Sequence, residues 1–271
     1  MPERTDLEIA RIVEYGEAES FIDMFAAAPP ELGCRVEHIG SAIALISPTL
    51  PITLFNRVLC LGIDQPVTES TVTDALQIYR KSGLPFHAVQ LAPIAQPPSL
   101  PAWLMQHGYK QTDNWVKMIR TPDLTISVPT SLRIEQITPD RALDFAQVAA
   151  ASFGMPPNII PWMVALVGRP NWQHFVGYDG DLPIAAGAIY IHNQIGWLGI
   201  GGTLPSHRKR GAQGAIMAHR IRAATEAGCQ WVVTETGDDH PNYPNPSYHN
   251  MLRTGFELAY RRRNYIFEAN T

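Results

Sequence analysis

The chain has 271 residues, of which 45% are hydrophobic and 17% are charged, a balance typical of a folded protein and not of a disordered one. Its net charge of −4 argues against a general nucleic-acid binder, and no apolar run reaches the ~18 residues that a membrane span needs. Three cysteines, Cys34, Cys60 and Cys229, suit neither a disulfide framework nor a zinc site. We therefore expect a cytoplasmic protein without a bound metal.

The length is comfortable for two domains, and the first part predicts an α/β layout. Apolar residues spaced along 7–28 predict one or two helices, which Pro29 and Pro30 end. Further helices are expected over 68–82, with Thr68 as a candidate cap, and in a short stretch up to His107. Strands are expected at 34–50, 52–61, 86–91 and 115–119.

Residues 120–130 contain Pro122 and Pro129 and are expected to form a linker, so we place the two domains at 1–125 and 126–271. The residue pattern of the second domain predicts the element order β-α-α-β-β-β-α-β-α-β, which indicates an α/β fold with a mixed sheet. Thr138 is the expected N-cap of its first helix, with Pro139 at the first helical position. Strands are expected at 131–137, 175–178, 182–192, 196–204, 231–236 and 258–267, and helices at 139–152, 159–167, 211–227 and 247–254.

The charge is unevenly spread between the two halves. Residues 1–125 carry 9 Lys/Arg and 14 Asp/Glu, whereas residues 126–271 carry 12 and 11. The basic residues of the second half gather at 208–210 and at 261–263. We interpret the second cluster as a solvated strand face.

The most informative segment is the basic, glycine-bearing loop that precedes the expected helix 211–227. A helix N-terminus has unpaired N–H groups and the positive end of the helix dipole. Glycines let this backbone approach a phosphate, and Arg208 and Arg210 add charge that a pyrophosphate can share. The chain has no Walker loop and no G-x-G-x-x-G after a first strand. Taken alone, the segment fits an ordinary basic loop equally well.

The loop and a later segment, residues 250–256, both carry recognisable sequence motifs. Residues 208–213 read Arg-x-x-Gly-x-Gln after a Thr-Leu-Pro, which resembles motif A of the GNAT acetyltransferase superfamily. Residues 250–256, ending in Gly-Phe, resemble the motif that follows it in that superfamily, and the order of elements over 131–267 also fits. The resemblance implies a GNAT fold and an N-acetyltransferase that uses acetyl-CoA as co-substrate.

By this resemblance, the cofactor would be held by one strand end and the loop after it. Thr203 and Leu204 would offer backbone groups to the pantetheine arm, and Asn250 would lie near that arm. The gap between strands 196–204 and 231–236 would hold the thioester. The pyrophosphate would lie on Arg208, Lys209, Arg210, Gly211, Ala212, Gln213 and Gly214.

Two residues depart from the family's pattern. Gln213 stands where the family has Gly or Ala, which is tolerable if its side chain points away. Met251 stands where many members have a tyrosine that protonates the CoA thiolate, and methionine has no proton to donate. Tyr248, one turn earlier, can serve as the acid only if the helix is rotated or shifted.

For the general base we nominate Glu235, at a strand end beside the expected thioester. Residues 238–240, Asp-Asp-His, would relay a proton through water, and backbone N–H groups near Leu204 would polarise the thioester carbonyl. A solvated strand-end carboxylate is the competing interpretation of Glu235.

The first half carries a faint copy of the second. Residues 103–109 resemble 250–256, and in both halves a helix–strand unit comes before. We therefore expect two tandem GNAT-like domains, each a mixed, mostly antiparallel twisted sheet flanked by helices. The first would be degenerate and lack a phosphate loop, because 61–68 has no Arg-x-x-Gly-x-Gly pattern.

Three functions remain open at this point. The first is an N-acetyltransferase for a small-molecule or peptide amine, with no nucleic-acid or membrane partner. The second is a non-catalytic acyl-CoA sensor or regulatory module. The third, a transferase that takes an aminoacyl group from a charged tRNA, is disfavoured by the acidic balance of the chain. The first half would shape the acceptor cleft or mediate a homodimer.

Overall fold

The computed structural model describes residues 5–123 and 125–269, which divide into two compact units. Unit 1 takes its residues from 1–117, 236–240 and 258–271, and unit 2 takes its residues from 118–235 and 241–257. The chain first leaves unit 1 within strand β5 (Lys110–Arg120), a few residues before the boundary expected from sequence. The last strand, which the sequence analysis assigned to the second domain, is part of unit 1.

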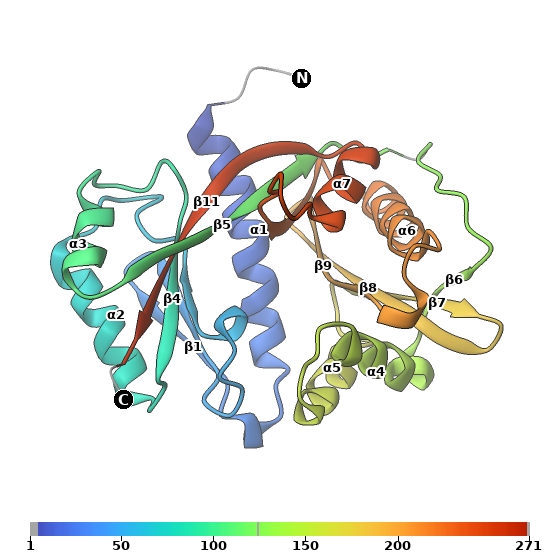
Figure 1. The fold of residues 1–271 in the computed structure, drawn as a ribbon, viewed down its shortest axis with the longest axis horizontal. Coiled ribbons are helices and arrows are strands. Elements are labelled where there is room, and N and C mark those ends of the chain that lie inside the picture. The colour runs from blue at the N-terminus through green and yellow to red at the C-terminus, as the bar shows by residue number, and fades with distance from the viewer. Residues whose placement is uncertain (1–4, 124, 270–271) are drawn as a thin grey trace. The chain divides into compact units, whose positions relative to one another are not determined.

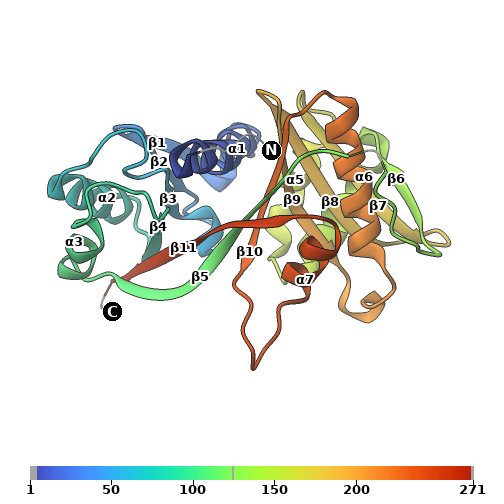
Figure 2. The ribbon, with the colours of Figure 1, turned by 90° about the horizontal axis from the view of Figure 1, so that it is seen from above.

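Unit 1 is a mixed sheet with helices on both faces (Figure 1). Its strand order is β1-β2-β3-β4-β11-β5, and only β3 and β4 are recorded as a parallel pair. Figure 2 shows β11, the last strand of the chain, running beside β5. The elements are α1 (Asp6–Ala26), β1 (Arg35–Ile39), β2 (Ala42–Ile46), β3 (Arg57–Leu59), α2 (Glu69–Lys81), β4 (Phe86–Leu91), α3 (Leu100–Gln106) and β11 (Glu257–Glu268).

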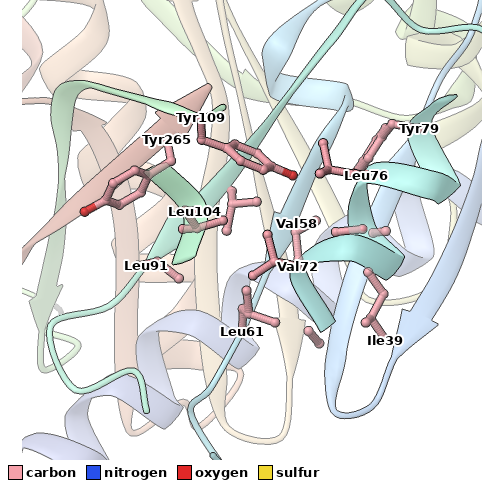
Figure 3. Packing of buried hydrophobic residues seen from close by; sticks show 14 of the residues in the cluster. Ile39, Val58, Leu61, Val72, Leu76, Tyr79, Leu91, Leu104, Tyr109 and Tyr265 are labelled. Carbon is pink, nitrogen blue, oxygen red and sulfur yellow. The ribbon is translucent and has the colours of Figure 1, made fainter. Parts of the chain in front are cut away.

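Alternate residues of the central strands face opposite helices. Val58 and Val89 pack with the apolar side of α2, including Leu76 and Tyr79, in the core drawn in Figure 3. Thr68 is the N-cap residue of α2, as its position before the helix predicts, and its N–H donates to the Thr71 hydroxyl at 3.2 Å. The neighbouring residues of β3 and β4 point to the other face, where α1 lies.

The α1 face holds a buried ionic network centred on Glu17. Arg57 and Arg262 each donate to the Glu17 carboxylate at 2.6 Å, and Lys117 donates to it as well. Arg262 also contacts Glu14 at 3.1 Å, and all five side chains are 0–1% exposed. The network therefore joins α1, β3, β5 and β11.

The prediction of a solvated strand face at 261–263 is therefore wrong for its central residue. Arg261 pairs with Asp238 at 2.8 Å on the exposed side, whereas Arg262 is fully buried. The two-residue period of a strand sends neighbours to opposite faces, and α1 covers the face that receives Arg262.

Unit 2 contains strands in the order β10-β9-β8-β7-β6, with one parallel pair, β9 with β10. Helices α4 and α5 lie on one face and α6 on the other (Figure 1). The elements are β6 (Arg133–Gln136), α4 (Ala142–Ser152), α5 (Ile160–Leu166), β7 (Trp172–Asp179), β8 (Leu182–His192), β9 (Ile195–Thr203), α6 (Ala212–Glu226), β10 (Trp231–Gly237) and α7 (Pro246–Arg253). The last two residues of β10 belong to unit 1.

The helix expected at 139–152 begins later than predicted. Residues Pro139–Arg141 form a 3₁₀ turn, and α4 starts at Ala142 because Arg141 has non-helical backbone angles. Thr138 caps the 3₁₀ turn without a side-chain hydrogen bond to the backbone. Over the described ranges, no helix has the length and apolar character needed to cross a membrane.

Replacing Glu17 with Gln should strongly destabilise the protein, because three buried cations would then face the single carboxylate of Glu14. Removing one partner of a buried ion pair typically costs about 3–5 kcal/mol. The measurement is the free energy of unfolding by urea titration, followed by circular dichroism. Glu19→Gln, on the same helix but half-buried, is the control. An equal loss in both variants would contradict the prediction.

Candidate functional site

Strands β9 and β10 are paired along only part of their length. Their parallel register runs from Ile195↔Trp231 to Leu198↔Thr234, where the Thr234 hydroxyl donates to the Leu198 carbonyl at 2.8 Å. Strand β9 continues to Thr203 beyond the last recorded pair. The edge of β9 after Leu198 therefore has backbone groups that β10 does not pair in register.

The same stretch of β9 carries a bulge. The register with β8 shifts between Ala186 and Ala188, and Ile200 adopts a left-handed φ of 54°. A bulge adds one residue to a strand and turns the backbone locally. A side chain could not replace Gly199 without movement, because its Cβ would lie 1.9 Å from the Trp197 ring.

A buried arginine from α6 lies beneath this bulge. Arg220 donates through one nitrogen to the carbonyl oxygens of Ala188 and Gly199, both at 3.1 Å. It is 3% exposed, and burial lowers its pKa to about 10, so it remains a cation at neutral pH. The sequence analysis missed Arg220; the glycines opposite it were the available signal.

The loop between β9 and α6 has two residues in the left-handed backbone region. Lys209 and Gly211 both have left-handed φ angles, of 65° and 79°. Gly211 is the N-cap of α6 and supplies no capping side chain, and residues 208–211 are exposed. The first N–H groups of α6 therefore have no side-chain cap from the N-cap residue, and the loop before them is open to solvent.

The two arginines of this loop differ in their contacts. Arg210 donates to both carboxylate oxygens of Asp179, one of them at 3.0 Å, and this hydrogen bonding lowers the pKa of Asp179. Arg208 makes only a 3.5 Å contact, to the Thr203 carbonyl, and no ion pair within the described chain. Arg208 is thus the more available charge for a ligand.

Gln213, the first departure from the family pattern, points toward α7. Its amide nitrogen donates to Ser247 at 3.3 Å, and its oxygen accepts from Asn250 at 3.0 Å. Asn250 also accepts from Arg253 at 2.6 Å. Asn250 therefore joins α7 to the start of α6. Gly214 packs against Val128, because a Cβ added to Gly214 would lie only 3.1 Å from a methyl carbon of Val128.

The predicted catalytic residues lie in different surroundings. Glu235 is half-buried and comes directly after the last paired residue of β10. Tyr248 is half-buried on α7, whereas Met251 is 5% exposed and belongs to the core. Asp238 pairs with Arg261 in unit 1, so its carboxylate is engaged there.

The backbone donor predicted near Leu204 needs a correction. The Leu204 N–H donates to the Ile184 carbonyl at 2.9 Å, so it is already engaged with β8. Successive N–H groups of a strand point to opposite sides. The available donors are therefore those on the other side of β9, between Gly199 and Thr203.

Comparison with known proteins identifies the architecture. No family model matches the sequence, and no curated protein matches it. A GCN5-related N-acetyltransferase from Kribbella flavida aligns over 97% of this chain and 96% of its own, with a TM-score of 0.67 and 18% identity. One from Sphaerobacter thermophilus aligns over 84% and 80%, with a TM-score of 0.61 and 16% identity. The chain has the GNAT fold. The GNAT fold expected from the sequence is confirmed.

A third solved structure is a tandem GNAT protein from the clavulanic acid biosynthesis pathway. It aligns over 79% of this chain and 75% of its own, with a TM-score of 0.54 and 17% identity. These likenesses confirm an α/β fold with a mixed sheet flanked by helices.

Replacing Gly199 with Ala should destabilise unit 2, because the new methyl group would overlap the buried Trp197 ring. Overpacking of this kind typically costs about 1–3 kcal/mol. The measurement is urea unfolding followed by tryptophan fluorescence. Gly199→Ala should also change the native emission spectrum of the protein, since the Trp197 ring must move. Gly180→Ala, in open space at φ 60°, should lose only the roughly 1–2 kcal/mol of a left-handed alanine and keep the native spectrum. An unchanged native emission spectrum in Gly199→Ala would contradict the prediction.

Proposed function

We propose that the protein is an acyl-CoA-dependent N-acetyltransferase that moves an acetyl group from acetyl-CoA to a small-molecule or peptide amine. The observation that carries this proposal is one continuous feature of unit 2. The β9 edge that β10 leaves unpaired leads directly into the exposed loop 208–211 and the N-terminus of α6. The unpaired strand edge would bind the thioester arm of acetyl-CoA, and the loop with the helix N-terminus would bind its pyrophosphate.

The residues present fit the cofactor's charged end. Gly211 and Ala212 would present N–H groups to the pyrophosphate at the positive end of α6. Arg208 and Lys209 would add charge, while Arg210 would first have to leave Asp179. Thr203 and Leu204 would run beside the pantetheine arm, with Gln213 and Asn250 holding α7 against the start of α6.

The reaction transfers one acyl group and one proton. The amine nitrogen attacks the thioester carbon and the carbon–sulfur bond breaks, leaving an amide and a thiolate. Glu235 would accept the proton of the attacking amine. Tyr248 would protonate the thiolate if its hydroxyl can reach the sulfur. A thiol with a pKa near 8.5 is already a fair leaving group, so this second role is the less demanding one.

We further propose that unit 1 is a degenerate second GNAT-like domain. Its β3–α2–β4 unit repeats the strand–helix–parallel strand arrangement of β9–α6–β10. In unit 1 the space after β3 is closed, because Gln96 donates its N–H to Gly62 at 2.8 Å and accepts from Val67 at 3.1 Å. One acetyl-CoA per chain is the expected stoichiometry. The free thiols Cys34, Cys60 and Cys229 suit a cytoplasmic setting.

Replacing Arg208 with Ala should weaken acetyl-CoA binding about 10- to 100-fold, since a hydrogen bond to a charged group is worth about 1.5–3 kcal/mol. Arg210→Ala should weaken binding less, because Arg210 already pairs with Asp179. Isothermal titration calorimetry with acetyl-CoA measures both. Equal losses in the two variants would show that the Asp179 pair is not kept in the complex. No binding by the unmodified protein would overturn the proposed function.

Replacing Glu235 with Gln should lower kcat about 10²- to 10⁴-fold, the usual contribution of a general base, with little change in acetyl-CoA affinity. The measurement is thiol release with a panel of amines, beside calorimetry of the same variant. Glu226→Gln, at the exposed end of α6, is the control. A Glu235→Gln variant with the turnover of the control would remove Glu235 as the base. Tight acetyl-CoA binding without turnover on any amine would favour a non-catalytic sensor.

A further inference from the structure

Arg220 is an unusual residue at its position in unit 2. It is a fully enclosed cation whose recorded hydrogen bonds go to the backbone carbonyls of Ala188 and Gly199, and no ion pair of Arg220 occurs in the described part of the chain. Burying a charge without a counter-charge is costly. An ordinary helix–sheet contact would be served by a leucine or methionine, so packing alone does not explain this side chain.

The surrounding backbone is shaped to admit the guanidinium group. A Cβ on Gly187 would lie 3.1 Å from its central carbon, and a Cβ on Gly201 would lie 3.2 Å from one of its nitrogens. Gly187 is on β8 and Gly201 is on β9, so glycines of both strands border the group. Together with the bulge at Ile200, they form a fitted site for one arginine.

The charge lies beside the β9 edge that β10 leaves unpaired. Ala188 and Gly199 are partners across β8 and β9, one position beyond the last pair of β9 with β10 at Leu198. The Gly199 carbonyl and the Ile200 N–H belong to one planar trans peptide, in which the two groups point in opposite directions. A cation hydrogen-bonded to the carbonyl withdraws electrons from this peptide and makes its N–H a stronger donor.

We propose that Arg220 is a positioning residue that polarises the Gly199–Ile200 peptide, so that the Ile200 N–H can stabilise the negative charge that develops on the thioester oxygen. This inference rests on the proposed acetyl transfer. Arg220 itself touches neither substrate; it acts through one peptide group. It also holds that peptide in place, since it binds one carbonyl on each of the paired strands β8 and β9.

The test is infrared difference spectroscopy of acetyl-CoA labelled with ¹³C at the thioester carbonyl and bound to the full chain. The unmodified protein should shift the carbonyl band to lower wavenumber than in free acetyl-CoA. Arg220→Met should lose most of that shift and about tenfold or more in kcat, less than the 10²–10³ of removing a direct donor, with KM for acetyl-CoA little changed. Arg220→Lys should retain part of both.

Two further variants separate polarisation from packing. Arg222→Met, two residues along α6 and half-buried, should leave the band in place. Gly201→Ala keeps Arg220 but crowds its nitrogen at 3.2 Å, and it should move the band partway back even if Arg220→Met does not fold. A band at the same wavenumber in the unmodified protein and in these Arg220 and Gly201 variants would overturn this inference alone. Absence of acetyl-CoA binding in the unmodified protein would overturn the proposed function and this inference with it.

Discussion

The carboxylate of Glu17 is the contact on which the arrangement of the chain depends. It accepts from cations on β3, β5 and β11. The chain first leaves unit 1 within β5 and returns to it for the last time at β11. These strands are neighbours in the sheet of unit 1, so the long segment between them begins and ends at one place. A segment whose ends are fixed close together can fold as a unit of its own. Through Glu17, helix α1 thus binds residues far from it in sequence, Lys117 on β5 and Arg262 on β11.

The sequence predicts most elements because hydrophobic period and turn residues act locally. The strands at 86–91 and 182–192 and the capped helix after Thr68 are found where they were expected. Arg262 was misplaced for a different reason. A strand pattern tells which residues share a face, but it does not tell what covers that face. Only the position of α1 makes Arg262 a buried partner of Glu17.

In the candidate site, too, some features follow from neighbouring residues in the sequence, whereas others depend on contacts between distant residues. The exposed loop at 208–211 follows from residue types that fix its own backbone, such as the left-handed Gly211. Three contacts depend on strand register and a bulge. They are the hydrogen bond of the Leu204 N–H to Ile184, the pairing of Arg210 with Asp179 and the hydrogen bonds of Arg220 to two strand carbonyls. One extra residue in β9 decides which N–H groups face β8, and no motif in the sequence marks that residue.

In the proposed acetyl transfer, the core position of Met251 changes which groups could assist the reaction. No proton donor occupies that position, and Tyr248 lies one turn away on α7. Departure of a thiolate needs little help, because the corresponding thiol has a pKa of only about 8.5. The harder step is the build-up of charge on the carbonyl oxygen as the amine attacks, and a preorganised donor is the usual remedy. By our proposal, a buried cation beneath the β9 bulge would supply such preorganisation through a peptide group at the edge of β9. Under the proposed function, the methionine at position 251 and the presence of Arg220 are thus consistent with one chemistry, in which the carbonyl and not the leaving sulfur would receive the main assistance.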